Sequence, residues 1–210
     1  MPANLPNALT VSRILATPVV CVLAVLGTAF GNWLALAAYL YACITDFLDG
    51  YLARSRKQQS PFGEMLDPIA DKLLVGALLL VLVGIGRIEG IDMLPALIIL
   101  CREIVVSGLR EYLARLNVGM PVTRLAKWKT TLQMVALGFL IVGDAGPRFG
   151  PLAATDIGLW GLWLAAVLTL MTGYDYLRAS LRHVVGAAAS SGPEPAGEEH
   201  PARPLERADG

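Results

Sequence analysis

Apolar residues in this chain are grouped into long runs, and polar residues collect in the short stretches between them. Hydrophobic residues make up 55% of the 210 residues, which is too apolar a composition for an ordinary soluble domain. Six runs are each about 20 residues long, the length at which an α-helix crosses the hydrocarbon core of a bilayer. The pattern therefore predicts an all-α integral membrane protein with six transmembrane helices. Their predicted ranges are 11–30, 33–54, 66–88, 93–116, 127–142 and 156–176.

Basic residues are divided unequally between the two ends of these predicted helices. An even number of spans places both termini on one side. Eleven Lys and Arg residues lie near that side, and only Arg87 and Arg148 lie near the other. Because positive charge is enriched on the cytoplasmic side, we expect a multi-pass protein of the cell (inner or plasma) membrane with cytoplasmic termini. The eleven are Arg13, Arg54, Arg56, Lys57, Arg110, Arg115, Arg124, Lys127, Lys129, Arg178 and Arg182.

The last part of the chain has a different composition. From Gly186 onward it is rich in Ala, Ser, Gly, Pro and Glu and has almost no large apolar residue. Such a segment buries too little surface to offset the entropy lost on ordering. We expect a membrane domain over residues 1–185 and a disordered cytoplasmic tail over residues 186–210.

Three cysteines, Cys21, Cys43 and Cys101, lie within the apolar runs. Their odd number and their spacing predict neither a disulfide framework nor a thiolate metal site. We expect them to be buried as small hydrophobic residues.

Four aspartates interrupt the apolar pattern where the second predicted helix ends and the third begins. Asp46 and Asp49 are three residues apart, and Asp67 and Asp71 are four apart, so each pair shares one helix face. An isolated carboxylate near the centre of a span costs about 2.5–3.5 kcal/mol, so these groups need partners. Clustered carboxylates repel one another unless a cation neutralises them. Oxygen ligands without His or Cys favour Mg²⁺, Mn²⁺ or Ca²⁺, so the cluster predicts a divalent metal site at the membrane surface.

Basic residues of the fourth and fifth predicted helices approach the same side of the membrane. Arg102 and Arg110 are eight residues apart and share a helix face, and Lys127 and Lys129 open the next helix. Arg and Lys are the usual protein ligands of phosphate. We therefore expect a polar cavity, open to the cytoplasm, with metals on one wall and an anion site on the other. That arrangement suggests phosphoryl transfer.

One stretch of 26 residues carries a spaced pattern of Asp, Gly, Ala and Arg. It is Asp46-x2-Asp49-Gly50-x2-Ala53-Arg54-x8-Gly63-x3-Asp67-x3-Asp71. This pattern resembles the signature of the CDP-alcohol phosphotransferase family and matches it without a departure. Residues 4–10 with Arg13, 101–104, 107–111 and 127–130 add to the resemblance, which covers about residues 4–180.

The resemblance implies roles for individual residues. It implies two divalent cations, Mg²⁺ or Mn²⁺, and a general base that takes the proton of the acceptor hydroxyl. The implied metal ligands are Asp46, Asp49, Asp67 and Asp71, and the implied base is Asp71. The implied contacts with the CDP moiety are Asn7, Gly50, Ala53 and Arg54. The implied contacts with the acceptor phosphate are Arg102, Arg110, Lys127 and Lys129.

Within the family, the chain resembles bacterial members that transfer the phosphatidyl group of CDP-diacylglycerol to glycerol 3-phosphate. The resemblance also implies a homodimer in the lipid bilayer, and we expect no nucleic-acid partner. Other acceptors stay open: inositol phosphate, or phosphatidylglycerol as in a cardiolipin synthase. The basic residues favour a phosphorylated acceptor but do not separate glycerol phosphate from inositol phosphate.

A divalent-cation transporter is the alternative from a different class of protein. It would use the aspartates as a translocation site. A transporter gives no reason for Gly50, Ala53 and Arg54 to accompany the aspartates, or for four basic residues to gather beside a cation path.

Overall fold

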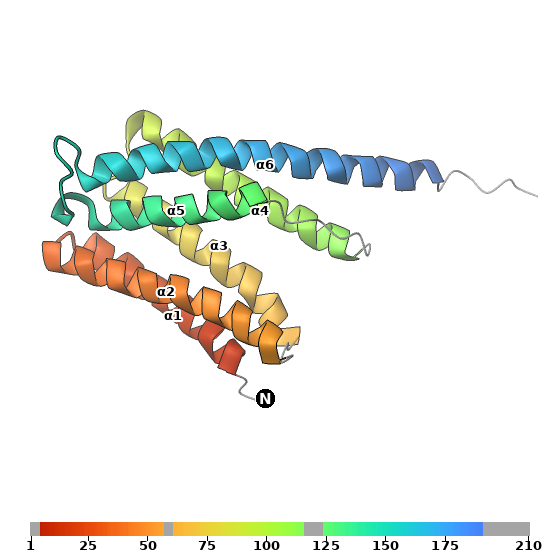
Figure 1. The fold of residues 1–210 in the computed structure, drawn as a ribbon, viewed down its shortest axis with the longest axis horizontal. Coiled ribbons are helices and arrows are strands. Elements are labelled where there is room, and N and C mark those ends of the chain that lie inside the picture. Colours follow the sequence, from red (N-terminus) through yellow and green to blue (C-terminus); the bar gives the residue numbers. More distant parts are fainter. Residues whose placement is uncertain (1–4, 57–60, 116–123, 191–210) are drawn as a thin grey trace, which may run out of the picture.

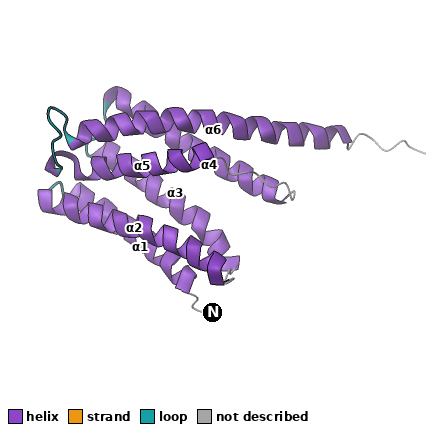
Figure 2. Ribbon diagram, viewed as in Figure 1, coloured by secondary structure: helices purple, strands orange, loops and turns teal. Residues whose placement is uncertain are grey.

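The structure, a computed structural model, describes residues 5–56, 61–115 and 124–190. Within these ranges the chain forms α-helices and short connections without a β-strand, so the all-α prediction is confirmed there (Figures 1 and 2). The helices are α1 (Leu5–Val25), α2 (Ala29–Arg56), α3 (Pro61–Gly84), α4 (Met93–Arg115), α5 (Arg124–Val142) and α6 (Ala154–Ser190). Two single turns of 3-10 helix, η1 (Gly90–Asp92) and η2 (Gly143–Ala145), precede α4 and follow α5.

The helices occupy the six predicted positions, but several ends differ from the prediction. Helix α1 begins at Leu5 rather than at residue 11, and α2 and α3 continue into the connection predicted over 55–65. Pro61 opens α3, where a residue without a backbone N–H removes no helical hydrogen bond. Asp46 and Asp67 therefore lie inside helices, and their positions are fixed by helical backbone.

The C-terminal boundary also differs from the prediction. Helix α6 continues to Ser190, five residues into the segment predicted to be disordered. This helical end includes three consecutive alanines, Ala187 to Ala189, which have the highest helix propensity. Residues 191–210 lie outside the described residues, so the disordered tail stays a prediction there.

The helices form two groups that share one core. Helix α1 packs along α2 and α3, while α6 packs along α4 and α5. Contacts of α2 with α5 and of α3 with α4 join the groups. The two groups lie close together at one end of the molecule and diverge toward the end that carries the N-terminus (Figure 1). The shared core includes Leu78, Leu82, Ile99, Leu137, Leu140 and Leu162.

We call the end at which the two groups of helices lie close together the closed end. Hydrogen bonds from side chains join the helix connections there. Asn32 Nδ2 donates to the carbonyl of Val142 at 3.2 Å, and Trp33 Nε1 donates to that of Ala145 at 3.2 Å. Arg87 Nη1 donates to the carbonyl of Leu140 at 2.7 Å and also contacts that of Ile141. These bonds join the end of α5 and η2 to α2 and to the connection that follows α3.

Gly143 is required where Arg87 crosses this end. Its φ is +53°, and a Cβ there would lie 2.7 Å from Arg87 Cζ. We expect Gly143→Ala to lower the free energy of unfolding by about 1–3 kcal/mol, from backbone strain and loss of the Arg87 contacts. Thermal unfolding in detergent measures this change. Gly84→Ala is the matched control, since nothing lies within 4 Å of a Cβ there. Equal melting temperatures for the two variants would contradict the prediction.

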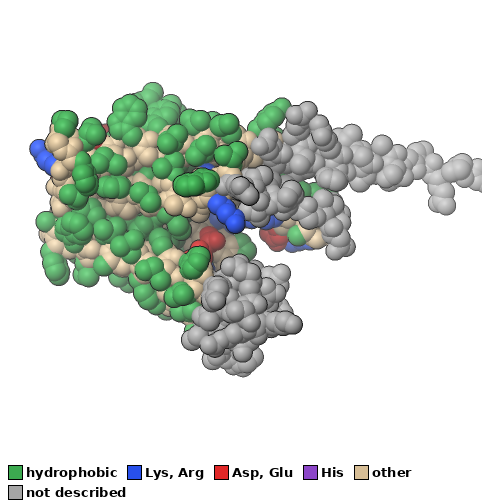
Figure 3. Space-filling model, in the orientation of Figure 1, with side chains coloured by type: hydrophobic (Ala, Val, Ile, Leu, Met, Phe, Trp, Pro, Cys, Tyr) green, Lys and Arg blue, Asp and Glu red, His purple; other side chains and the backbone are tan. Residues whose placement is uncertain are grey.

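Much of the surface is apolar, as the sequence predicts for a protein in lipid (Figure 3). In the described part of the chain, two segments are long and apolar enough to cross a membrane: Asn7–Val25 and Ala154–Tyr174. The other four helices do not meet the same criterion of length and composition in the described residues, so the six-span topology stays a prediction. Cys101 is exposed rather than buried, and that part of the cysteine prediction is wrong.

Candidate metal and substrate site

Three of the signature carboxylates converge on one arginine of the first helix. Arg13 of α1 is 1% exposed. Its Nη1 donates to Asp71 Oδ1 at 2.6 Å and contacts Asp46 Oδ1, and its Nη2 lies 3.6 Å from Asp67 Oδ1. Because Asp46 belongs to α2 and the other two to α3, a single guanidinium brings the acidic groups of both helices together.

Thr10 extends this contact by one helical turn. Its hydroxyl, which is buried, donates to Asp67 Oδ1 at 2.7 Å. Thr10, Arg13 and Thr17 recur at helical spacing and form the buried face of α1, which continues into apolar residues toward its C-terminal end. Helix α1 therefore presents its polar end to the aspartates and its apolar end to the core.

The donor set fits a hard divalent cation. Asp46 and Asp71 contact the same nitrogen atom, so their oxygens border a common volume, and carboxylate oxygens are the preferred ligands of Mg²⁺ and Mn²⁺. The Asp49 side chain lies outside the described residues. Among the side chains that are described, no three acidic, His or Cys groups are already close enough together to bind one ion.

The residues predicted to contact the CDP moiety are placed only in part. Gly50, Ala53 and Arg54 lie in the last turns of α2, and their side chains are outside the described set. Asn7 is half-buried in α1, one turn before Thr10, on the helix face that meets the aspartates. The helical register thus keeps Asn7 on the carboxylate side of α1.

A second cluster of charges joins α4, α5 and α6. Lys129 is nearly buried, with 3% of its side chain exposed, and it donates to Glu103 Oε1. Arg102 Nη2 donates to Thr172 Oγ1 at 3.2 Å, and its Nη1 lies 3.5 Å from Glu103 Oε1. Lys129 and Arg102 therefore each have a partner within the protein that ties one helix to the next.

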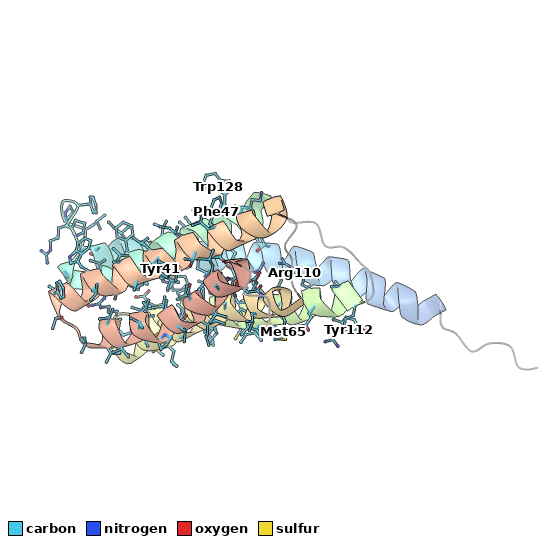
Figure 4. The ribbon with its side chains drawn as sticks, turned by 90° about the horizontal axis from the view of Figure 1, so that it is seen from below. Tyr41, Phe47, Met65, Arg110, Tyr112 and Trp128 are labelled. Carbon is cyan, nitrogen blue, oxygen red and sulfur yellow. The ribbon has the colours of Figure 1, made fainter. Side chains whose placement is uncertain are left out.

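Arg110 and Lys127 are more exposed than these two residues. Arg110 lies inside the outline of the bundle in Figure 4, whereas Met65, Tyr112 and Trp128 lie at its edge. Arg102 and Arg110 are both near enough to Lys129 for their charges to act on its ammonium. The four basic residues that are predicted to contact the acceptor phosphate thus all belong to α4 and α5, at one end of the molecule.

The acidic and basic clusters adjoin each other. The charges of Glu103 and Asp71 are near enough to repel, although they lie on α4 and α3. In Figure 3, acidic side chains lie opposite basic ones in a recess between the two groups of helices. The arrangement brings carboxylates suited to cations beside basic groups suited to phosphate.

Arg13 and Glu103 were not predicted as site residues from the sequence. In the sequence, Arg13 contributes to the positive-inside asymmetry and to the family resemblance, and neither gives it a role in the site. A charged residue within a predicted span needs a partner, and the four aspartates were the available ones. Glu103 is likewise a charged residue within a predicted span. Its neighbours in the sequence are basic or apolar, so a basic partner is expected for it too.

Comparison with known proteins places this arrangement in a family. The family model described as CDP-alcohol phosphatidyltransferase matches residues 3–171, which include α1 to α5 and the first half of α6. The chain belongs to the CDP-alcohol phosphatidyltransferase family. The resemblance inferred from the signature is therefore confirmed, and the protein is an enzyme of this class.

Individual relatives of this CDP-alcohol phosphatidyltransferase agree with the family match. A Rickettsia typhi protein named CDP-diacylglycerol–glycerol-3-phosphate 3-phosphatidyltransferase is 47% identical over 176 residues, covering 84% of this chain and 96% of its own. A Cereibacter sphaeroides protein of the same name is 39% identical, covering 86% and 97%. The fold resembles that of the Mycobacterium tuberculosis phosphatidylinositol phosphate synthase solved with CDP-diacylglycerol bound. The TM-score is 0.59 at 21% identity, over 85% of this chain and 87% of that one.

Proposed function

We propose that this protein transfers the phosphatidyl group of CDP-diacylglycerol to glycerol 3-phosphate, forming phosphatidylglycerophosphate and CMP. The observation that carries the proposal is the convergence of Asp46, Asp67 and Asp71 on the buried guanidinium of Arg13, beside the basic residues of α4 and α5. The names of the relatives at 39–47% identity support glycerol 3-phosphate as the acceptor.

Divalent cations belong to this proposal. Asp46, Asp49, Asp67 and Asp71 would hold two ions, Mg²⁺ or Mn²⁺. When bound, the ions neutralise the charge of the pyrophosphate and of the leaving CMP. The protein supplies the oxygen ligands from two helices whose backbones are fixed by packing against α1.

Asp71 is the proposed general base. In the transfer, the acceptor hydroxyl oxygen attacks the phosphorus that bears diacylglycerol, and the bond from this phosphorus to the CMP oxygen breaks. The hydroxyl proton passes to the Asp71 carboxylate. Asp71 is the most accessible of the three described carboxylates, with 54% of its side chain exposed against 35% for Asp46 and 47% for Asp67. An acceptor can therefore approach it.

The CDP moiety would bind along the end of α2 and the start of α1. Gly50 and Ala53 have small side chains that allow a nucleotide to approach the helix closely, and Arg54 would hold a phosphate. Asn7 would add a polar contact from α1. These assignments derive from the family resemblance and from the helical register.

The acceptor phosphate would bind mainly to Arg110 and Lys127, the more exposed basic residues. Arg102 and Lys129, which have partners in Thr172 and Glu103, would shape this wall and add positive potential to it.

Replacing Lys127 tests whether the acceptor phosphate binds to α4 and α5 while the CDP moiety binds to α1 and α2. We expect Lys127→Ala to raise KM for glycerol 3-phosphate by about 10- to 100-fold, because a charge-assisted hydrogen bond to phosphate is lost. KM for CDP-diacylglycerol should change little. Arg115→Ala is the control, since Arg115 is exposed and pairs with Glu111. Weaker binding of the CDP-lipid alone would contradict the assignment.

We also propose six membrane spans in the cell membrane, with both termini and the site on the cytoplasmic side, and a homodimer. The excess of basic residues at the end of the bundle that holds the aspartates supports this orientation. Labelling of single cysteines introduced at residues 2 and 148, from either side of sealed vesicles, tests the orientation. Equal accessibility from the same side would contradict it.

An acceptor panel tests the reaction itself. Purified protein would receive CDP-diacylglycerol, Mn²⁺ and one acceptor: glycerol 3-phosphate, inositol phosphate or phosphatidylglycerol. We expect CMP release with glycerol 3-phosphate to exceed that with the others. Faster release with another acceptor would reassign the substrate within the family, and metal transport into vesicles without CMP release would favour the transporter alternative.

A further inference from the structure

Arg13 has a place in the site that neither the proposed ligands nor the proposed base explains. Its guanidinium is buried among three carboxylates, so one positive charge faces three negative ones. A buried charge is tolerated only with partners, and carboxylates that lie this close together repel one another unless a cation neutralises them. Arg13 therefore neutralises part of the charge of the carboxylate cluster.

The guanidinium lies between carboxylates of α2 and α3 that would hold a divalent cation. One nitrogen, Nη1, contacts both Asp46 of α2 and Asp71 of α3. An ion shared by these two carboxylates would need the same space and the same oxygen atoms. Two cations repel at such a distance, so the ion and Nη1 cannot both occupy it.

The backbone of α1 can stay in place while the guanidinium moves. Thr10 holds the helix to Asp67, and the Thr17 hydroxyl donates to the carbonyl of Arg13 at 3.1 Å. The Arg13 side chain, in contrast, is long and has several rotatable bonds. The exchange of one cation for another thus requires a change of side-chain rotamer and no movement of the helix.

We infer that Arg13 is a resident counterion: it holds the carboxylates of α2 and α3 together in the metal-free protein and is displaced when a divalent cation binds. Arg13 is thus a positioning residue that acts on the metal site. The inference rests on the proposed metal site at Asp46 and Asp71 and adds a role that the family signature, which begins at Asp46, does not contain.

Binding of Mn²⁺ to the full-length protein in detergent, followed by the electron paramagnetic resonance of free Mn²⁺, tests the exchange without substrate. Arg13→Gln removes the competing charge, so Mn²⁺ should bind about tenfold more tightly than to the wild type, or tighter still. In chelator, the same variant should melt about 10 °C lower, because three carboxylates lose their cation. Added Mn²⁺ should restore more of the melting temperature than it does in the wild type.

Two further variants separate the exchange from a purely structural role. Arg13→Lys keeps a cation and should keep the melting temperature and Mn²⁺ affinity near those of the wild type. Arg115→Gln removes an exposed charge on α4 and should change neither quantity. A structural role alone would lower the melting temperature of Arg13→Gln without tightening Mn²⁺ binding.

The outcomes distinguish this inference from the proposed metal site. Unchanged or weaker Mn²⁺ binding by Arg13→Gln, with normal binding by the wild type, overturns the exchange and leaves the metal site standing. Wild-type protein that binds no Mn²⁺, or binds it equally after Asp46→Asn, overturns both. If Arg13→Gln is folded only with Mn²⁺ present, that supports the exchange, and failure to fold even with Mn²⁺ contradicts it.

Discussion

Asp71→Asn is expected to lower kcat for CMP release by at least about 10²-fold and up to about 10⁴-fold, the contribution typical of a general base. The amide cannot take the proton of the acceptor hydroxyl and is a weaker ligand for a divalent cation. Arg13 keeps Asp46 and Asp67 as partners, so the protein should stay folded. The measurement is initial-rate CMP release in detergent, with the melting temperature as a check on folding.

The matched control for this change is Asp144→Asn, which alters an exposed carboxylate of η2 at the closed end. This control should keep the wild-type rate. Residual turnover of Asp71→Asn within a few-fold of the wild type would remove Asp71 as the base. It would not affect Asp46 or Asp67 as metal ligands.

Glu103→Ala is expected to cause the largest loss of stability, about 3–5 kcal/mol in the free energy of unfolding. Lys129 would keep a nearly buried ammonium without its carboxylate partner, and Arg102 would lose a neighbouring negative charge. A loss of this size is a large part of the net stability of a protein domain. Thermal or denaturant unfolding in detergent measures it.

A double-mutant cycle separates the structural role of Lys129 from a role in substrate binding. Glu103→Ala with Lys129→Met should regain most of the lost stability, since the unpaired ammonium is gone. If Lys129 also binds the acceptor phosphate, Lys129→Met should raise KM for glycerol 3-phosphate in an otherwise stable protein. A double variant as unstable as Glu103→Ala would show that the pair does not govern stability.

The architecture follows from the sequence to a large extent because the strongest signals are local. Runs of about 20 apolar residues predict helices, and all six positions hold one in the described residues. Spacings of three and four place Asp46 with Asp49 and Asp67 with Asp71, since these offsets face one direction on any helix. Helix ends were less accurate because an end such as Pro61 depends on capping and packing over a few residues.

The aspartates of the candidate site were predictable because their spacing is local in the sequence. The ion-pair partners, Arg13 for the aspartates and Glu103 for Lys129, were not predictable in this way. The signature residues lie within one stretch of 26 positions, so their spacing is visible in the chain. Arg13 is separated from Asp71 by 58 positions, and Lys129 from Glu103 by 26. The position of Arg13 within a predicted span indicates that it needs a partner, but the sequence near Arg13 does not identify that partner.

The sequence by itself determined the helices, the faces that carry the aspartates and the family to which the chain belongs. The tertiary structure decided which charges meet: Arg13 with the aspartates, and Glu103 with Lys129. The physical reason is that helical periodicity fixes directions around one axis only. Which faces meet depends on how neighbouring helices rotate and cross, and packing of the whole bundle sets these angles.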